Sequence, residues 1–261
     1  MERIKQALEK ARQERHVRQD SGAASPDPRF PPAEAVNQEA TREVSIDSAL
    51  LRENRIIAGM PPGPFVDAYN LMRTRILQSF KENHWSTLGI TSPGVSAGTS
   101  LTAINLAISI AREVDYSVLL VDANLRHPWM LEHFGLAHMK GLSDYLTSDI
   151  PVTDLLLRLA NIDHLVVLPG GRPLTNSAEM LNSPKMIRLT EELKSRDQRR
   201  IIIYDLPPVL TSSDTLAFIP NVDATLVVVE EGATQKKELE QAIEMLSVTN
   251  IIGTILNKAE V

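Results

Sequence analysis

A loop rich in small residues and two aspartates at strand ends carry the residue types best suited to phosphate chemistry. The loop covers 92–98 and lies between a short apolar run at 88–90 and a helical pattern at 101–110. Such a loop presents backbone N–H groups at the start of a helix, where the helix dipole also favours negative charge. Ser100 stands where the hydroxyl of a phosphate-binding loop would hold Mg²⁺. The segment therefore predicts a site for nucleotide phosphates.

The loop departs from the usual phosphate-binding motif at one position. That motif has Gly, then Lys, then Ser or Thr, whereas Gly98 is followed here by Thr99. The lysine that would reach the β- and γ-phosphates is therefore missing from its expected place. The residues that we expect around the phosphates are Gly94, Val95, Ser96, Ala97, Gly98, Thr99, Ser100 and Leu101.

Two apolar runs each end in an aspartate: 118–121 precedes Asp122, and 200–204 precedes Asp205. Ligands of open parallel sheets bind beyond the carboxyl ends of the strands, so both carboxylates should converge on the loop. A hydroxyl and two carboxylates around a phosphate form the oxygen environment that Mg²⁺ prefers. We therefore expect Ser100, Asp122 and Asp205 to hold Mg²⁺. Either aspartate alone could instead serve only as a turn or cap residue.

A dinucleotide site is the rival interpretation of the same segment. Asp122 follows the loop at about the spacing of a ribose-binding acid. However, the loop lacks the G-x-G-x-x-G pattern, and Asp205 has no role in that kind of site. The residues therefore favour the phosphate-loop reading.

Alternating apolar runs and helical patterns must position these residues. Because the runs are apolar without alternation and are separated by helices, they predict an α/β fold: a doubly wound, mostly parallel sheet with helices on both faces, like that of P-loop NTPases. The expected strands are 88–90, 118–121, 164–168, 200–205, 224–230 and 251–256. The expected helices, besides 101–110, are 65–80, 178–196, 213–219 and 235–247.

Three segments are expected along the chain. Residues 1–19 predict an amphipathic helix that packs on its own domain or on a sister subunit, with docking on a partner protein as the alternative. Residues 20–64 are predicted to be a flexible linker, rich in Pro and small residues at first, with a short apolar segment at 44–60. Residues 65–261 should form the P-loop NTPase-like domain.

The composition narrows the function classes. The net charge of −6 argues against binding to nucleic acid. The sequence has no cysteine, which excludes disulfides and fits a reducing compartment. It contains neither the ~20-residue apolar run of a membrane span nor the apolar core of a secretory signal. We therefore expect a cytoplasmic protein.

Several motifs together resemble the bacterial tyrosine kinases (BY-kinases). They are VLLVDANLRHP, IIIYDLPPVL with a later acid at Asp214, LPGGRPLTNSAEMLNSPKM, GLSDYL and IIGTILNK, which spread the resemblance over about 65–258. The resemblance implies ATP or ADP with Mg²⁺ as cofactors, tyrosine autophosphorylation, and a role in capsular or other exopolysaccharide biosynthesis. It also implies a membrane-bound polysaccharide chain-length or export protein as partner, recruitment by it to the inner membrane, and formation of a homo-oligomer.

The resemblance assigns roles position by position. Asp205 matches the Walker B acid, Asp122 the first acid of the second acidic motif, and Asn124 the position of its second acid. These three are the residues that the resemblance marks as catalytic. Asn257 matches an asparagine that can contact adenine, although a polar strand-end residue is an equal alternative.

The chain departs from the family in ways that weaken catalysis. Thr99 replaces the lysine, Asn124 replaces a carboxylate, and NKAEV replaces a C-terminal tyrosine cluster. Loss of one preorganised electrostatic donor typically costs about 10²–10³ in rate. In the family's oligomerisation helix, E-x-x-R-x-x-R, the second arginine alone remains, as Arg73, so most of the pattern for ring assembly is missing.

We therefore expect a catalytically impaired member, a pseudokinase that regulates exopolysaccharide production. The first alternative is an active autokinase in which Arg126, or a neighbouring subunit, replaces the lysine. The second is a partition or cell-positioning ATPase. Those proteins carry an extra lysine early in the loop, and 93–98 contains none.

Overall fold

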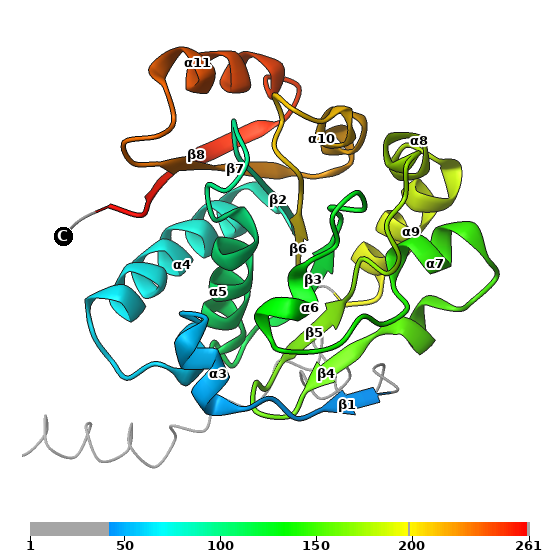
Figure 1. The fold of residues 1–261 in the computed structure, drawn as a ribbon, viewed down its shortest axis with the longest axis horizontal. Helices are drawn as coiled ribbons and strands as arrows, with labels where there is room; N and C mark the ends of the chain where they lie inside the picture. The colour runs from blue at the N-terminus through cyan, green and yellow to red at the C-terminus, as the bar shows by residue number, and fades with distance from the viewer. Residues whose placement is uncertain (1–41, 198, 260–261) are drawn as a thin grey trace, which may run out of the picture.

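The computed structural model describes residues 42–197 and 199–259. Within them, eight strands form one sheet in the order β1-β4-β5-β3-β6-β2-β7-β8, which runs from bottom to top in Figure 1. Each neighbouring pair is parallel except β4 and β5. The prediction of a mostly parallel sheet is confirmed. The strands are β1 (Arg42–Val44), β2 (Thr87–Thr91), β3 (Ser117–Asp122), β4 (Leu157–Leu159), β5 (Leu165–Leu168), β6 (Arg200–Asp205), β7 (Ala224–Glu230) and β8 (Asn250–Asn257).

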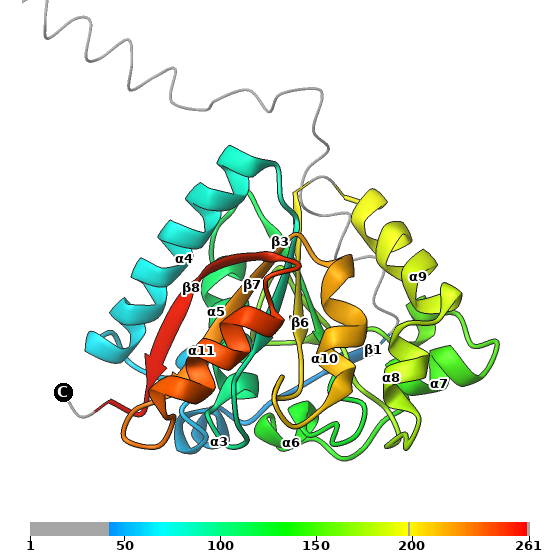
Figure 2. The same cartoon turned by 90° about the horizontal axis from the view of Figure 1, so that it is seen from above.

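Helices cover both faces of the sheet, as Figure 2 shows for α4 and α9 on opposite sides. Every residue of β2, β3 and β6 is buried, which explains why these strands are apolar without alternation. Alternate residues of β3 enter two separate cores, Leu120 on one face and Leu119 on the other.

Each core takes its helices from different parts of the chain. The first core is closed by α3 (Ser48–Glu53), α4 (Pro64–Asn83), α5 (Thr99–Ala111), α6 (Met130–His133) and the 3₁₀ turn η1 (Ile57–Gly59). The second is closed by α7 (Leu142–Thr147), α8 (Ser177–Leu181), α9 (Pro184–Ser195), α10 (Ser213–Phe218), α11 (Lys236–Met245) and the turns η2 (Val152–Leu155) and η3 (Ile219–Asn221). No helix in the described part of the chain is long and apolar enough to cross a membrane.

The single helix expected at 178–196 is wrong. The structure divides it into α8 and α9, with the break at Asn182 and Ser183. Ser183 caps the second helix by accepting a hydrogen bond at its Oγ from the N–H of Met186, at 3.3 Å. Pro184 lacks an N–H group and fits the first turn of a helix better than its interior. Local capping therefore overrides the continuous helical pattern.

Part of the expected linker is folded. Residues 42–64, within the predicted linker 20–64, contain β1, α3 and η1, and Ile56 and Ile57 are fully buried. The buried Asn105 on α5 holds this segment: its Oδ1 accepts from the N–H of Ile57 and its Nδ2 donates to the carbonyl of Arg55, each at 3.0 Å. The packed domain therefore includes residues 42–64. The expected helix at 1–19 lies outside the described residues, as does the rest of that linker.

Candidate functional site

The two predicted acidic residues lie side by side at the carboxyl ends of adjacent strands. Asp122 ends β3 and Asp205 ends β6, and the two are paired residues in the parallel register. Their exposed fractions are 1% and 2%. On the other side of β6, Ile90 of β2 is paired with Asp205, so the loop that follows β2 leaves the sheet beside this carboxylate. The sheet register thus brings the loop and both acids together.

Burial makes negative charge costly at this pair. It raises the pKa of Asp205 to about 7, against a hydrogen bond from the Ser100 hydroxyl, which lowers it. It also raises the pKa of Asp122 well above its usual range, and the charge of Asp205 adds to that effect. Backbone N–H groups of Met130 and Asn124, at 3.3 and 3.2 Å from the Asp122 carboxylate, act in the opposite direction. A divalent cation between the two carboxylates would favour their charged forms.

The polar atoms at this site suit Mg²⁺. Ser100, Asp122, Asp205 and Asn124 offer oxygen donors, and Asn124 Oδ1 is buried without a hydrogen-bond partner. Oxygen-only surroundings are those that Mg²⁺ prefers. Across the described residues there is no group of three or more His, Cys, Asp or Glu that could hold a metal.

The loop between β2 and α5 has the shape of an anion cradle. Gly98 caps α5 with φ of 86°, and Ser96 also has a positive φ, 64°. A Cβ at Gly98 would lie 2.2 Å from Nδ2 of Asn257, so glycine is required both by the backbone and by the space. Val95, at the tip, is 68% exposed. The loop thus leads into the N-terminus of a thirteen-residue helix, where unpaired N–H groups favour an anion.

The residue in the lysine position closes the loop on itself. Thr99 Oγ1 donates to Ser92 Oγ at 3.0 Å, and Ser92 Oγ in turn donates to the carbonyl of Gly94 at 2.7 Å. Thr99 therefore ties the start of α5 to the start of the loop. Its side chain is uncharged, so it cannot supply the electrostatic contact of the absent lysine.

The arginine considered as a substitute is engaged elsewhere. Nε of Arg126 lies 3.1 Å from Oδ1 of Asp214, whose side chain is fully buried, while the arginine side chain is 42% exposed. The pair joins the segment after β3 to the helix α10 that follows β6. The sequence marks Asp214 only as a later acid of a motif, because nothing in the spacing indicates its partner.

Two further residues support the site: Gly170, which the sequence shows only as part of a longer motif, and Asn257, which the resemblance places near adenine. Gly170 lies against Asp122: a Cβ there would be 3.0 Å from Asp122 Oδ2 and 2.5 Å from Pro128 Cβ. Its backbone also hydrogen-bonds the Asp122 carboxylate. Asn257 donates from Nδ2 to the carbonyl of Ala97 at 2.8 Å, which makes it part of the loop's support. Its contact with adenine stays a prediction.

The chain is similar to several proteins named as tyrosine kinases. It is 30% identical over 209 residues to the tyrosine-protein kinase YwqD of Bacillus subtilis, covering 79% of this chain and 86% of that relative. The structure of the chimerical protein CapA2B2 matches with a TM-score of 0.73 and 25% identity, covering 88% of this chain and all of that one. The kinase domain of Escherichia coli ETK matches with a TM-score of 0.69 and 27% identity, covering 75% and 76%. No family model matches the chain.

Proposed function

The chain belongs to the bacterial tyrosine kinase family, and from this we propose that it is a nucleotide-binding regulatory member with weak or absent kinase activity. It binds ATP or ADP with Mg²⁺ and regulates the synthesis and export of a capsular or other exopolysaccharide. The observation that carries the proposal is the Thr99–Ser92 hydrogen bond in place of a lysine, next to the paired carboxylates of Asp122 and Asp205 and the unpartnered Oδ1 of Asn124.

Nucleotide binding depends mainly on groups that the chain retains. Backbone N–H groups of the loop and the first turn of α5 bind the phosphates, helped by the helix dipole. Ser100, Asp122 and Asp205 hold the Mg²⁺ that accompanies them. That cation, when bound, neutralises phosphate charge. The absence of a side chain at Gly170 lets its backbone lie against the Asp122 carboxylate.

Phosphoryl transfer depends on groups that the chain either lacks or uses in other contacts. The transferring group needs positive charge that is fixed in place before the reaction. Thr99 offers none, and Arg126 is paired with Asp214. Asn124 is an amide, so it cannot accept a proton from a hydroxyl as a carboxylate does.

The tyrosines of the chain are poorly placed as acceptors. Tyr69 is 8% exposed and Tyr204 is fully buried. Tyr116 precedes β3 at the end opposite Asp122, roughly 20 Å away for a strand of this length. Tyr145, on α7, is partly buried, with Lys185 Nζ 4.8 Å from the centre of its ring. Autophosphorylation within one molecule therefore has no favourable acceptor among the four.

The partner is a membrane-bound polysaccharide chain-length or export protein that recruits this cytoplasmic chain to the inner membrane. The family resemblance supports this, as does the similarity to the chimerical protein CapA2B2. Self-association is part of the family pattern and remains part of the proposal. Arg73, the retained arginine of the oligomerisation pattern, contacts its own subunit through Glu113 at 2.9 Å.

Calorimetric titration with MgADP and MgATP tests the binding half of this proposal. We expect binding by the wild type and loss of at least about tenfold in affinity for Asp205→Asn, which removes a charged Mg²⁺ ligand. Asp115→Asn is the matched control, because Asp115 is exposed at the other end of β3. Absence of binding by the wild type would contradict the nucleotide site.

A phosphotyrosine blot after incubation with MgATP tests the catalytic half. We expect no signal above that of Asp122→Ala. A strong signal from the wild type that Asp122→Ala abolishes would establish the active-autokinase alternative instead. Melting curves of both variants separate loss of function from loss of folding.

A further inference from the structure

The end of β8 returns to the tip of the phosphate loop. Asn257, the last residue of β8, donates from Nδ2 to the carbonyl of Ala97, and the next residue, Lys258, donates from Nζ to the carbonyl of Ser96, each at 2.8 Å. Two consecutive residues thus hold two consecutive carbonyls of the loop. We call the pair Asn257 and Lys258 the β8 clamp.

We propose that the β8 clamp orients the phosphate-binding N–H groups of the loop, with Lys258 as its charged positioning residue. In a planar trans peptide, the C=O and the N–H of the next residue point in opposite directions. Carbonyls held toward β8 at Ser96 and Ala97 therefore direct the N–H groups of Ala97 and Gly98 away from β8. The proposal rests on the proposed nucleotide site, because those N–H groups are the ones expected to meet phosphate.

The loop conformation needs such support. Ser96 has φ of 64°, a left-handed conformation that non-glycine residues seldom adopt and that persists only when surrounding contacts hold it. Lys258 is itself fixed in place: its Nζ also lies 2.9 Å from Oε1 of Glu230, and its backbone has φ of 60°. The carbonyl of Asn257 accepts from the N–H of Glu231 at 3.0 Å. The clamp is therefore anchored to the end of β7 before it reaches the loop.

The charge of Lys258 has a second consequence. Its side chain is 45% exposed, so the ammonium group lies at the surface beside the loop. A charged donor makes a stronger hydrogen bond to a carbonyl than a neutral donor does. Because the ammonium group is also paired with Glu230, it acts on the loop through this hydrogen bond and does not replace the missing lysine as a free charge.

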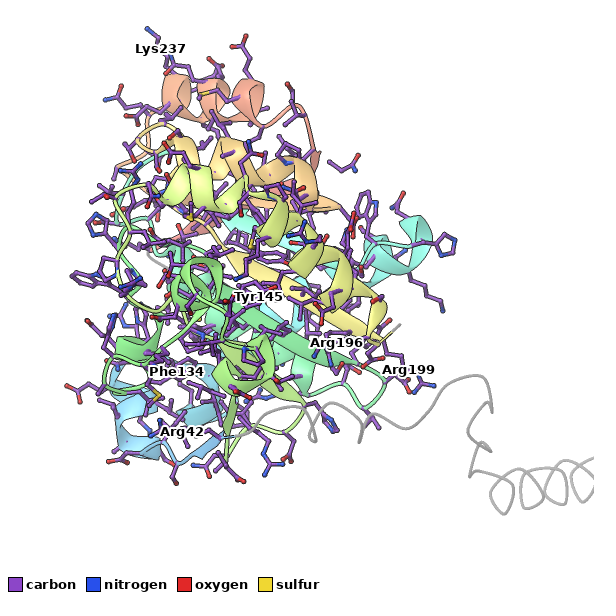
Figure 3. All side chains as sticks on the ribbon, turned by 90° about the vertical axis from the view of Figure 1, so that its right-hand side faces the viewer. Arg42, Phe134, Tyr145, Arg196, Arg199 and Lys237 are labelled. Atoms are coloured by element: carbon purple, nitrogen blue, oxygen red, sulfur yellow. The ribbon has the colours of Figure 1, made fainter. Side chains whose placement is uncertain are left out.

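The test compares the wild type with Lys258→Met, Lys258→Arg and the control Lys237→Met. Methionine keeps the length of the side chain but removes the donor and the charge, whereas arginine keeps both. Lys237 is exposed on α11 and projects into solvent in Figure 3. One readout is amide hydrogen exchange of loop peptides spanning 92–101 without nucleotide, and the other is MgADP affinity by calorimetry.

We expect Lys258→Met to speed exchange of the loop amides about tenfold and to weaken MgADP binding by a similar factor, with an unchanged melting temperature. Lys258→Arg should keep most of the wild-type protection of the loop amides and most of the MgADP affinity, and Lys237→Met should match the wild type in both measurements. If the loop amides of Lys258→Met exchange at the wild-type rate, the proposal that the β8 clamp orients the loop is wrong. If the wild type fails to bind MgADP, the proposed function fails, and the exchange rates still decide whether the clamp exists.

Discussion

At the scale of single residues, Asp122 and Asp205 couple the site to pH. Burial raises the pKa of Asp205 from 3.8 to about 7, so the folded protein binds a proton that the unfolded chain would release. This tighter proton binding by Asp205 stabilises the folded state. The stabilisation is fully present below the ordinary pKa of an aspartate, 3.8, and is lost as the pH rises to about 7. The metal-free protein should therefore lose stability over this window.

Asp205→Asn should remove that pH dependence, because asparagine resembles the protonated acid at every pH. At pH 5.5 the variant should already melt higher than the wild type, because about half of the window between 3.8 and about 7 has been crossed. Between pH 5.5 and pH 8 the difference in melting temperature should grow by about 4–8 °C, since about 1.5 pH units of linkage remain, or about 2 kcal/mol. Scanning calorimetry without Mg²⁺ measures this difference. A constant difference at both pH values would show that the carboxylate is charged throughout.

Thr99 is the second residue with a direct test. Thr99→Lys should raise MgATP affinity or turnover by up to about 10²-fold, because the lysine again neutralises phosphate oxygens beside Ser100. Thr99→Val is the control, since it removes the Ser92 hydrogen bond without adding charge. Equal behaviour of the two variants in a coupled ATPase assay would mean that charge at this position is not limiting.

At the scale of elements, the sequence predicts best where a strand is long and wholly buried. β3 and β6 could be located because an apolar run stops at an acid, and their parallel arrangement then brings Asp122 and Asp205 together. β1 and β4 have three residues each, too few for a periodic pattern. The pairing of Arg126 with Asp214 depends on how α10 packs, which no local pattern encodes. For the same reason the motif IIGTILNK contains Lys258 but does not reveal its contact with Ser96, which lies 162 residues away in the sequence.

Asn105 tests the packing of the segment that the sequence predicted as a linker. Asn105→Ala should lower the free energy of unfolding by about 2–4 kcal/mol, because it leaves the N–H of Ile57 and the carbonyl of Arg55 buried without partners. Urea denaturation measures the change. Asn83→Ala is the control, as Asn83 is exposed at the end of α4. Equal stability of the two variants would mean that residues 42–64 contribute little to the fold.

At the scale of the whole molecule, two cores on opposite faces share one sheet, and Arg73 joins α4 to α5 on the first face. Its guanidinium contacts Glu113 and donates to the carbonyl of Ser109 at 3.0 Å. The Arg73 side chain is only 18% exposed. Because Arg73 makes its contacts inside the subunit, the retained arginine does not by itself indicate a ring.

Arg73→Met should therefore reduce stability by about 1–2 kcal/mol without changing the molar mass in solution. Denaturation and light scattering after size exclusion measure the two quantities. A fall in molar mass with unchanged stability would instead assign Arg73 to a contact between subunits. Arg75→Met, two residues further along the same helix and exposed, is a control for loss of an arginine as such.

Gly98 and Asn257 occupy one shared space, which constrains the order in which the two positions can change over evolution. A side chain at Gly98 would collide with Nδ2 of Asn257 at 2.2 Å. Shortening Asn257 first would open that space but release the Ala97 carbonyl. The two positions thus form an epistatic pair, in which the effect of the second substitution depends on the first. A lineage leaving this arrangement must pass through a loosened loop before it can accept a side chain at position 98.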